Sequence, residues 1–168
     1  CGYHCVLMAL MLFGQVRRNA LIWDSRDVRL EALRKVAQRY YFDGCEVEQL
    51  QQQLAPYAER VHCKELRSRV AERTLDALAE GKLCLVCFST ERYMHWVLAV
   101  GVRCEAGDPV DLLVLDPAMA PTPLVPWNAM LTGWASKQPR RAVATFSERV
   151  NIDAVLVLSP MAPVNEDE

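Results

Sequence analysis

The chain has 168 residues, of which 52% are hydrophobic and 24% are charged, and its formal net charge is -2. This length and apolar content predict one compact domain with a buried core. The slightly acidic balance argues against a nucleic-acid partner, because phosphate binding needs a concentrated basic surface. We therefore interpret the arginines within residues 67–73 and at 140–141 as solvated faces.

The longest apolar run, residues 5–13, is shorter than the roughly 20 residues that a helix needs to span a bilayer. No basic region precedes it and no cleavage site of small residues follows it cleanly, so it does not resemble a signal peptide. The seven cysteines are odd in number and scattered, which favours free thiols in a reducing compartment. We expect no membrane span and a cytoplasmic location, and export as an effector stays open.

The first half of the chain is expected to be helical. An apolar helix is predicted over residues 3–13, followed by a connector at 20–23 that ends in the cap Asp24-Ser25. Apolar residues at helical spacing predict further helices over 27–41, 46–58 and 69–80. Asp43-Gly44 should separate the second from the third, Pro56 should end the third early, and Gly81 should stop the last.

From residue 82 onward the period of the pattern becomes that of strands. Strands are predicted over residues 83–88, 93–102, 111–116 and 154–158. Helices followed by a run of short strands indicate an α+β fold with an antiparallel sheet. No interdomain linker interrupts the sequence, so we predict a single domain over residues 1–159 and an acidic flexible tail over 160–168.

Two of the predicted strands carry a histidine and an aspartate. A turn centred on residues 105–108 would place His95 opposite Asp116 or its neighbour in an antiparallel pair. A carboxylate can then accept a hydrogen bond from one imidazole nitrogen and leave the other for a thiol. This is the base-and-orienter half of a catalytic triad. A surface histidine beside an Asp-Pro turn is the alternative interpretation.

Cys1 can supply the nucleophile if the start of the first helix packs against that hairpin. A thiol reacts as thiolate, and the positive end of a helix dipole favours the thiolate form. Gly2 would allow an unusual backbone turn and close approach of a substrate. Cys1 could also be a small buried residue near a chain end.

Other residues that could carry chemistry are weaker candidates. Cys84 and Cys87 have zinc-like spacing, but in a strand their side chains alternate faces, so we predict core packing and no metal site or cofactor. We expect His4 to point away from the cleft, and His62-Cys63 to lie in a loop or on a helix surface. Two tryptophan-containing features, residues 127–134 and Trp96, could contact substrate or simply pack; Trp96 could also shield the His95–Asp116 bond from water.

These features together resemble the papain-like, bacteriocin-processing bacterial cysteine peptidases that cut after double-glycine leaders. The resemblance runs in order from Cys1 to about Trp134 and rests on five segments: Cys1-Gly2-x-x-Cys5-x-x-Met8, Val28-x-Leu30-Glu31-x-Leu33, Leu78-x-x-Gly81-Lys82-x-Cys84-Leu85-Val86, His95-Trp96-Val97-Leu98-Ala99-Val100-Gly101 and Leu115-Asp116-Pro117-Ala118. It implies a papain-like fold with a helical half that bears the nucleophile and a twisted antiparallel sheet that bears the other two residues. It also implies that Cys1 is the nucleophile, His95 the general base and then acid, and Asp116 the orienter of His95.

The chain departs from this family in two ways. Family members carry a glutamine upstream of the nucleophile as an oxyanion donor, whereas this sequence starts at Cys1. Either a preceding segment holds that donor or the backbone and the Cys1 amine replace it. The leader peptidases are also usually fused to a transporter, and soluble relatives include amide hydrolases, acyl transferases and toxin-like domains.

We therefore expect a thiol hydrolase that acts through a Cys1 thioester on a peptide or protein substrate, with Gly2 and Trp96 as substrate-binding residues. Peptide-bond hydrolysis is the first choice. Deamidation of protein glutamines or acyl transfer would use the same triad, and a catalytically inactive peptide-binding module is the non-enzyme alternative. Self-cleavage just before Cys1 would leave the catalytic thiol on the first residue, where the α-amine, with a pKa of about 8, could share the work of the base.

Overall fold

The structure is a computed structural model that describes residues 1–17, 27–38, 45–120, 125–134, 140–143 and 147–161. Within these residues the chain forms four α-helices and one eight-stranded antiparallel sheet, which confirms the predicted α+β class. The predicted connector at 20–23, its cap Asp24-Ser25 and the break at Asp43-Gly44 lie outside the described residues, as does most of the predicted tail. No helix in the described part of the chain is both long and apolar enough to cross a bilayer.

The helices follow the apolar spacing of the sequence and end where local signals end them. They are α1 (Gly2–Leu12), α3 (Val28–Gln38), α4 (Val47–Leu54) and α5 (Val70–Ala79). Asp27 caps α3, since its side chain accepts the backbone N–H groups of Arg29 and Leu30. As predicted, Pro56 ends α4 early, and the chain continues as a short 3₁₀ helix, Ala55–Tyr57. Gly81, with φ of 75°, stops α5.

The sheet contains all four predicted strands and four further short ones. In chain order the strands are β1 (Val61–Glu65), β2 (Leu83–Ser89), β3 (Met94–Glu105), β4 (Asp108–Leu115), β5 (Ala129–Thr132), β6 (Arg141–Val143), β7 (Ser147–Arg149) and β8 (Asn151–Pro160). Their spatial order is β1-β8-β2-β3-β4-β5-β6-β7, and every neighbouring pair is antiparallel.

Two sequence-based predictions about the sheet need correction. His62 and Cys63 lie in edge strand β1, which pairs with β8, and not in a loop or on a helix. The alternating burial of β1 is a strand pattern. Its residues are mostly polar and lie between predicted helices, so the sequence alone did not indicate a strand there. At the other end, β8 runs from Asn151 to Pro160, and the Met161 N–H donates to the Arg60 carbonyl, so the last strand is longer at both ends than the predicted 154–158.

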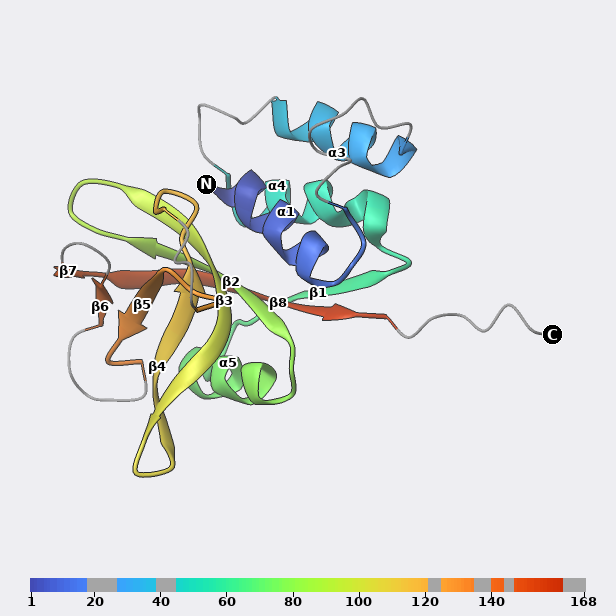
Figure 1. Ribbon diagram of the computed structural model, residues 1–168. Coiled ribbons are helices and arrows are strands. Elements are labelled where there is room, and N and C mark those ends of the chain that lie inside the picture. The colour runs from blue at the N-terminus through green and yellow to red at the C-terminus, as the bar shows by residue number, and fades with distance from the viewer. Residues whose placement is uncertain (18–26, 39–44, 121–124, 135–139, 144–146, 162–168) are drawn as a thin grey trace.

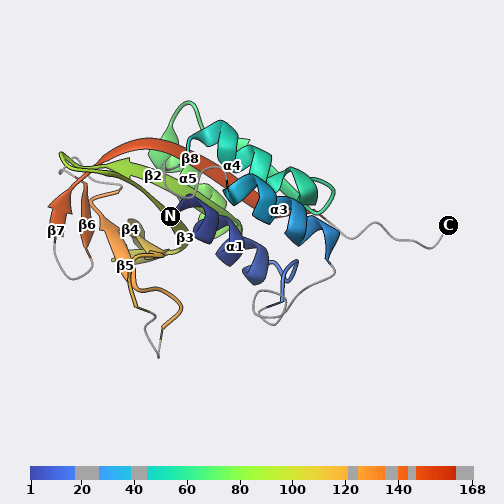
Figure 2. The ribbon, with the colours of Figure 1, turned by 90° about the horizontal axis from the view of Figure 1, so that it is seen from above.

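The sheet is covered differently on its two faces. Figures 1 and 2 show α1, α3 and α4 together on one face, α5 on the other, and β4 to β7 curling away to one side. Alternation along the strands divides the core accordingly. Leu85, Cys87, Trp96 and Leu98 pack under the three helices, whereas Cys84, Val86, Phe88, Val97 and Ala99 face the α5 side. The two cysteines of the Cys84-x-x-Cys87 motif thus lie on opposite faces, as predicted.

Candidate active site

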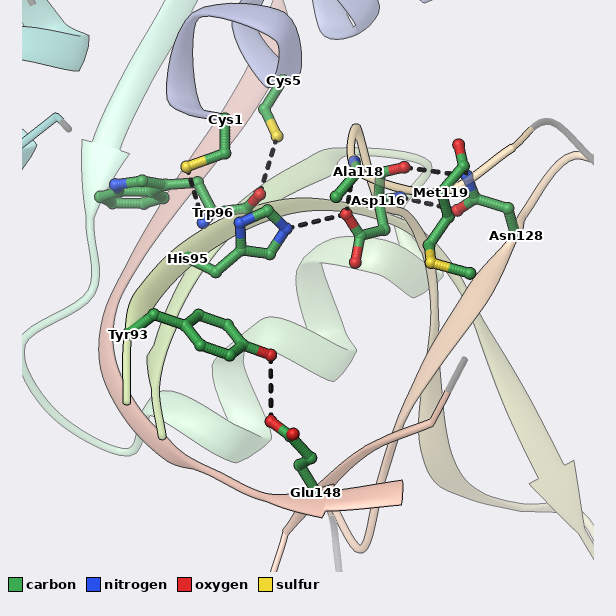
Figure 3. Close-up of polar contacts among 10 residues, drawn as sticks. All are labelled: Cys1, Cys5, Tyr93, His95, Trp96, Asp116, Ala118, Met119, Asn128 and Glu148. Atoms are coloured by element: carbon green, nitrogen blue, oxygen red, sulfur yellow. Dashed lines mark hydrogen bonds and ion pairs between the residues drawn. The ribbon is translucent and has the colours of Figure 1, made fainter. Parts of the chain in front are cut away.

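Cys1 lies at the start of α1, beside β3. It is the residue that caps the amino end of the helix, and its side chain is exposed. The backbone N–H of Trp96 donates to Cys1 Sγ over an N···S distance of 3.4 Å, so the first residue of the chain touches the strand that bears His95 (Figure 3). Two features favour negative charge on the sulfur: the Trp96 N–H donor from β3 and the positive end of the α1 dipole.

His95 and Asp116 form a short hydrogen bond at the end of the β3–β4 pair. The distance from His95 Nε2 to Asp116 Oδ1 is 2.8 Å, and each side chain is 14% exposed. Figure 3 shows the second ring nitrogen of His95 on the ring edge that faces Cys1. The three predicted catalytic side chains are therefore gathered at one place from three distant segments.

The register of this contact differs from the predicted one. Two bulges shift the β3–β4 pairing, and its last pair is Leu98 with Leu115. Counting one residue further, Asp116 stands opposite Val97, which shares a face of β3 with His95. The sequence placed His95 opposite Asp116 or its neighbour, and in the structure the two side chains meet diagonally across the pair, which lies within reach of a long side chain.

The Asp116 carboxylate is held by the turn that follows β4. Its Oδ1 also accepts the Ala118 N–H at 2.8 Å. Asn128 clamps the backbone of the same turn, because its Oδ1 accepts the Asp116 N–H and its Nδ2 donates to the carbonyls of Asp116 and Met119. Burial acts to raise the pKa of Asp116, but the hydrogen bonds from His95 and Ala118 outweigh it and hold that pKa below its usual value.

An ionised Asp116 sets the proton position on the imidazole. A carboxylate only accepts hydrogen bonds, so the neutral His95 ring that faces it carries its proton on Nε2. The lone pair of the neutral ring is then on Nδ1, the nitrogen on the Cys1 side. This is the proton arrangement that a general base with an orienting carboxylate requires.

Trp96 connects the two halves of the site through its backbone and packs its ring in the core. The Cys5 thiol donates to the Trp96 carbonyl at 3.3 Å, the Trp96 indole donates to the Cys45 carbonyl at 2.6 Å, and the ring is 2% exposed. Gly2 is also buried, and a Cβ there would lie 2.8 Å from Leu50 Cδ2. Both residues thus pack in the core and bring α1 close to its neighbours, and their predicted role in substrate binding stays a prediction.

The remaining thiols and histidines are placed differently from Cys1 and His95. Burial raises the pKa of Cys84 and Cys87 to about 12 and that of Cys63 to about 11, and it raises that of Cys5 further. Cys104 is the other described cysteine that is exposed. His4 is exposed on α1, where its ring meets Tyr3 edge-on.

A cavity of about 440 Å³ opens beneath the His95–Asp116 bond, on the α5 side of β3 and β4. Tyr93 and Phe88 flank the His95 ring edge-on, with centroid distances of 6.3 and 5.6 Å. The Tyr93 hydroxyl donates to Glu148 of β7 at 3.1 Å, below the His95 ring in the view of Figure 3. Among the described residues, no group of three or more histidine, cysteine or acidic side chains could hold a metal ion.

Sequence reasoning did not identify Asn128, Tyr93 or Glu148. Asn128 falls inside the tryptophan-containing segment 127–134, of which Trp134 packs in the core as a 1% exposed side chain while Ala129, Met130 and Leu131 line the cavity. An asparagine in this segment was a weak signal, since asparagine side chains commonly hold turns, but Asn128 stands 12 residues after the Asp116 that it contacts. No local pattern linked Tyr93 to Glu148, which is 55 residues away.

The comparisons with known proteins add no relatives: no family model, curated protein or solved structure matches this chain. The papain-like resemblance consequently stays a prediction that rests on the residues themselves.

Proposed function

We propose that this chain is a cysteine-dependent amide hydrolase of papain-like architecture, and that peptide bonds are its substrates. The observation that carries the proposal is the contact of Cys1 Sγ with the Trp96 N–H, because it sets an exposed thiol beside the oriented His95–Asp116 pair. A nucleophile, a base and a third group that orients the base are the recurring signature of covalent acyl transfer.

The chemistry follows from these positions. His95 Nδ1 takes the thiol proton as Cys1 Sγ attacks the substrate carbonyl carbon, which forms a tetrahedral oxyanion. The carbon–nitrogen bond then breaks while the His95 imidazolium returns its proton to the leaving nitrogen, and the acyl group stays on Cys1 as a thioester. Water attacks the thioester, its proton passes to Nδ1 and then to the departing sulfur, and the acid product leaves.

Asp116 and α1 support the charges in this sequence. The Asp116 carboxylate keeps the Nε2 proton in place and stabilises the imidazolium, and its lowered pKa keeps it ionised at neutral pH. The positive end of the α1 dipole lies at Cys1 and favours the negative charge that develops on the substrate carbonyl oxygen.

Selective alkylation tests the proposal before any substrate is known. We expect brief iodoacetamide treatment near pH 6 to label Cys1 first, because ordinary thiols with a pKa of about 8.5 are protonated there. Peptide mapping by mass spectrometry gives the rate at each cysteine, and exposed Cys104 is the internal reference.

Histidine variants make the same experiment specific. His95→Ala should remove the excess reactivity of Cys1, whereas His62→Ala, on the exposed face of β1, should leave it unchanged. His4→Ala tests the competing base three residues from Cys1. If Cys1 reacts no faster than Cys104 in the wild-type protein, the proposal is wrong and the peptide-binding module becomes the better interpretation.

A further inference from the structure

The cavity beneath the catalytic pair begins at the catalytic residues themselves. His95 and Asp116 both line it, so a group bound in it would lie against the base. Its volume of about 440 Å³ is within the range of about 300–1,000 Å³ that is usual for small-ligand pockets. The cavity is therefore continuous with the proposed reaction site and large enough to hold a side chain.

The walls of the cavity are mainly apolar. They come from β2 to β6 and the turn after β4, and include Phe88, Val97, Val114, Met119, Leu131 and Val143. Apart from the catalytic pair, the polar side chains that line it are Tyr93 and Glu148, which are already hydrogen-bonded to each other. No lysine or arginine is among the described residues that line it. An apolar group would gain most from entering such a space.

The position of His95 decides which part of a substrate enters the cavity. The imidazolium must give its proton to the leaving nitrogen, so the leaving group has to lie on the His95 side of the scissile bond. The acyl group stays on Cys1, which approaches from the α1 face of the sheet. The cavity lies on the α5 face of the sheet, so that His95 stands between Cys1 and the cavity (Figure 3).

We propose that this cavity binds the residue on the leaving-group side of the scissile bond, and that this residue carries a large apolar side chain. The proposal rests on the function proposed above and sharpens it. Deamidation releases ammonia, a molecule close in size to water, which occupies about 30 Å³ in the liquid. A cavity of this size beside the leaving group can be filled by the next residue of a peptide substrate, whereas ammonia is too small to fill it.

Product mimics test the binding site without any catalysis. Phenylalaninamide, leucinamide and glycinamide imitate the released fragment, and their binding to the Cys1→Ala protein is measured by ligand-observed NMR. We expect the two apolar amides to bind at least about tenfold more tightly than glycinamide, as burial of a large apolar side chain implies. Equal affinities for all three amides would overturn the proposal.

Variants locate that binding in the cavity. Ala142→Phe, added to the Cys1→Ala protein, fills the space from β6 and should abolish the preference, whereas Ala79→Phe, at the exposed end of α5 and outside the cavity, should not. If Ala142→Phe fails to fold, Met130→Ala decides the matter, because it enlarges the cavity and should improve tryptophanamide binding relative to leucinamide. A preference that neither change alters would contradict the assignment.

Cleavage of a mixed peptide library then tests the side of the bond, with cut sites read by mass spectrometry. Enrichment of leucine, methionine and phenylalanine directly after the cut supports the proposal, and enrichment before the cut overturns it. Cleavage without either preference removes the cavity proposal and leaves the proposed function standing. An uncut library, with Cys1 no more reactive than Cys104, removes the proposed function and the leaving-group assignment with it, even if the apolar amides bind.

Discussion

The two faces of the sheet differ in how completely they are filled. On the face beneath α1, α3 and α4, side chains such as Leu10, Leu85 and Leu98 are fully buried in one continuous cluster. On the other face, α5 covers β2, β3 and β8, but the curled strands β4 to β7 leave the cavity beneath His95. The filled face supplies packing and Cys1, and the hollow face supplies the proposed base and the proposed binding space. The two meet at the backbone of Trp96.

The largest expected effect comes from removing the Cys1 thiol, which is the group that the filled face contributes to the proposed reaction. Cys1→Ala should lower the rate of peptide hydrolysis at least about 10⁴-fold, as loss of a triad nucleophile does. Its thermal stability should hardly change, since Cys1 is exposed. A peptide-cleavage assay and a thermal melt check both expectations. Retained cleavage would show that the two faces do not cooperate in catalysis as we propose.

The difference in packing between the faces predicts a difference in stability. Leu98→Ala should cost about 2–5 kcal/mol, because Leu98 is fully buried and leaves a cavity in the filled cluster. Val143→Ala, on the wall of the existing cavity, should cost less than about 1 kcal/mol. Urea denaturation of both proteins measures the two values. Similar costs would mean that the second face is as tightly packed as the first.

Asn128 holds the turn that carries Asp116 of the proposed catalytic pair. Asn128→Ala removes the clamp on the Asp116 turn, and the resulting displacement of the carboxylate should lower the hydrolysis rate about tenfold. Asn151→Ala, at the exposed start of β8, is the matched control and should not change the rate. If the two variants behave alike, Asn128 has no role in positioning Asp116.

The smallest effect is a pH dependence of stability that arises at Asp116. Its pKa is lower in the folded protein than the unfolded value of about 3.9, so its contribution is complete above that value and is lost as pH falls through the folded pKa. The wild type should therefore be more stable than Asp116→Asn at neutral pH, and the gap should narrow below about pH 4. Thermal melts of both proteins from pH 2 to 7 measure it, and a constant gap would exclude this linkage.

Sequence reasoning succeeded where the physical signal is local. The spacing of apolar residues is enough to place α1, α3, α4 and α5, and Pro56 and Gly81 end two helices through their own backbone constraints. Strands β2, β3, β4 and β8 are long enough to show their period. Of the four strands it missed, β5, β6 and β7 have three or four residues each, which is too few for a period to stand out, and β1 is short and mostly polar.

For the candidate site, the sequence by itself determined which residue types are available: a cysteine that opens a helix, a histidine that opens a strand, and an aspartate that follows the next strand. Only the tertiary structure decided how they meet, because bulges shift the register and make the His95–Asp116 contact diagonal. It also assigned Gly2 and Trp96 to packing and brought Tyr93 to Glu148. Such contacts depend on how the sheet bends and which layer covers each face, and no pattern along a single segment records that.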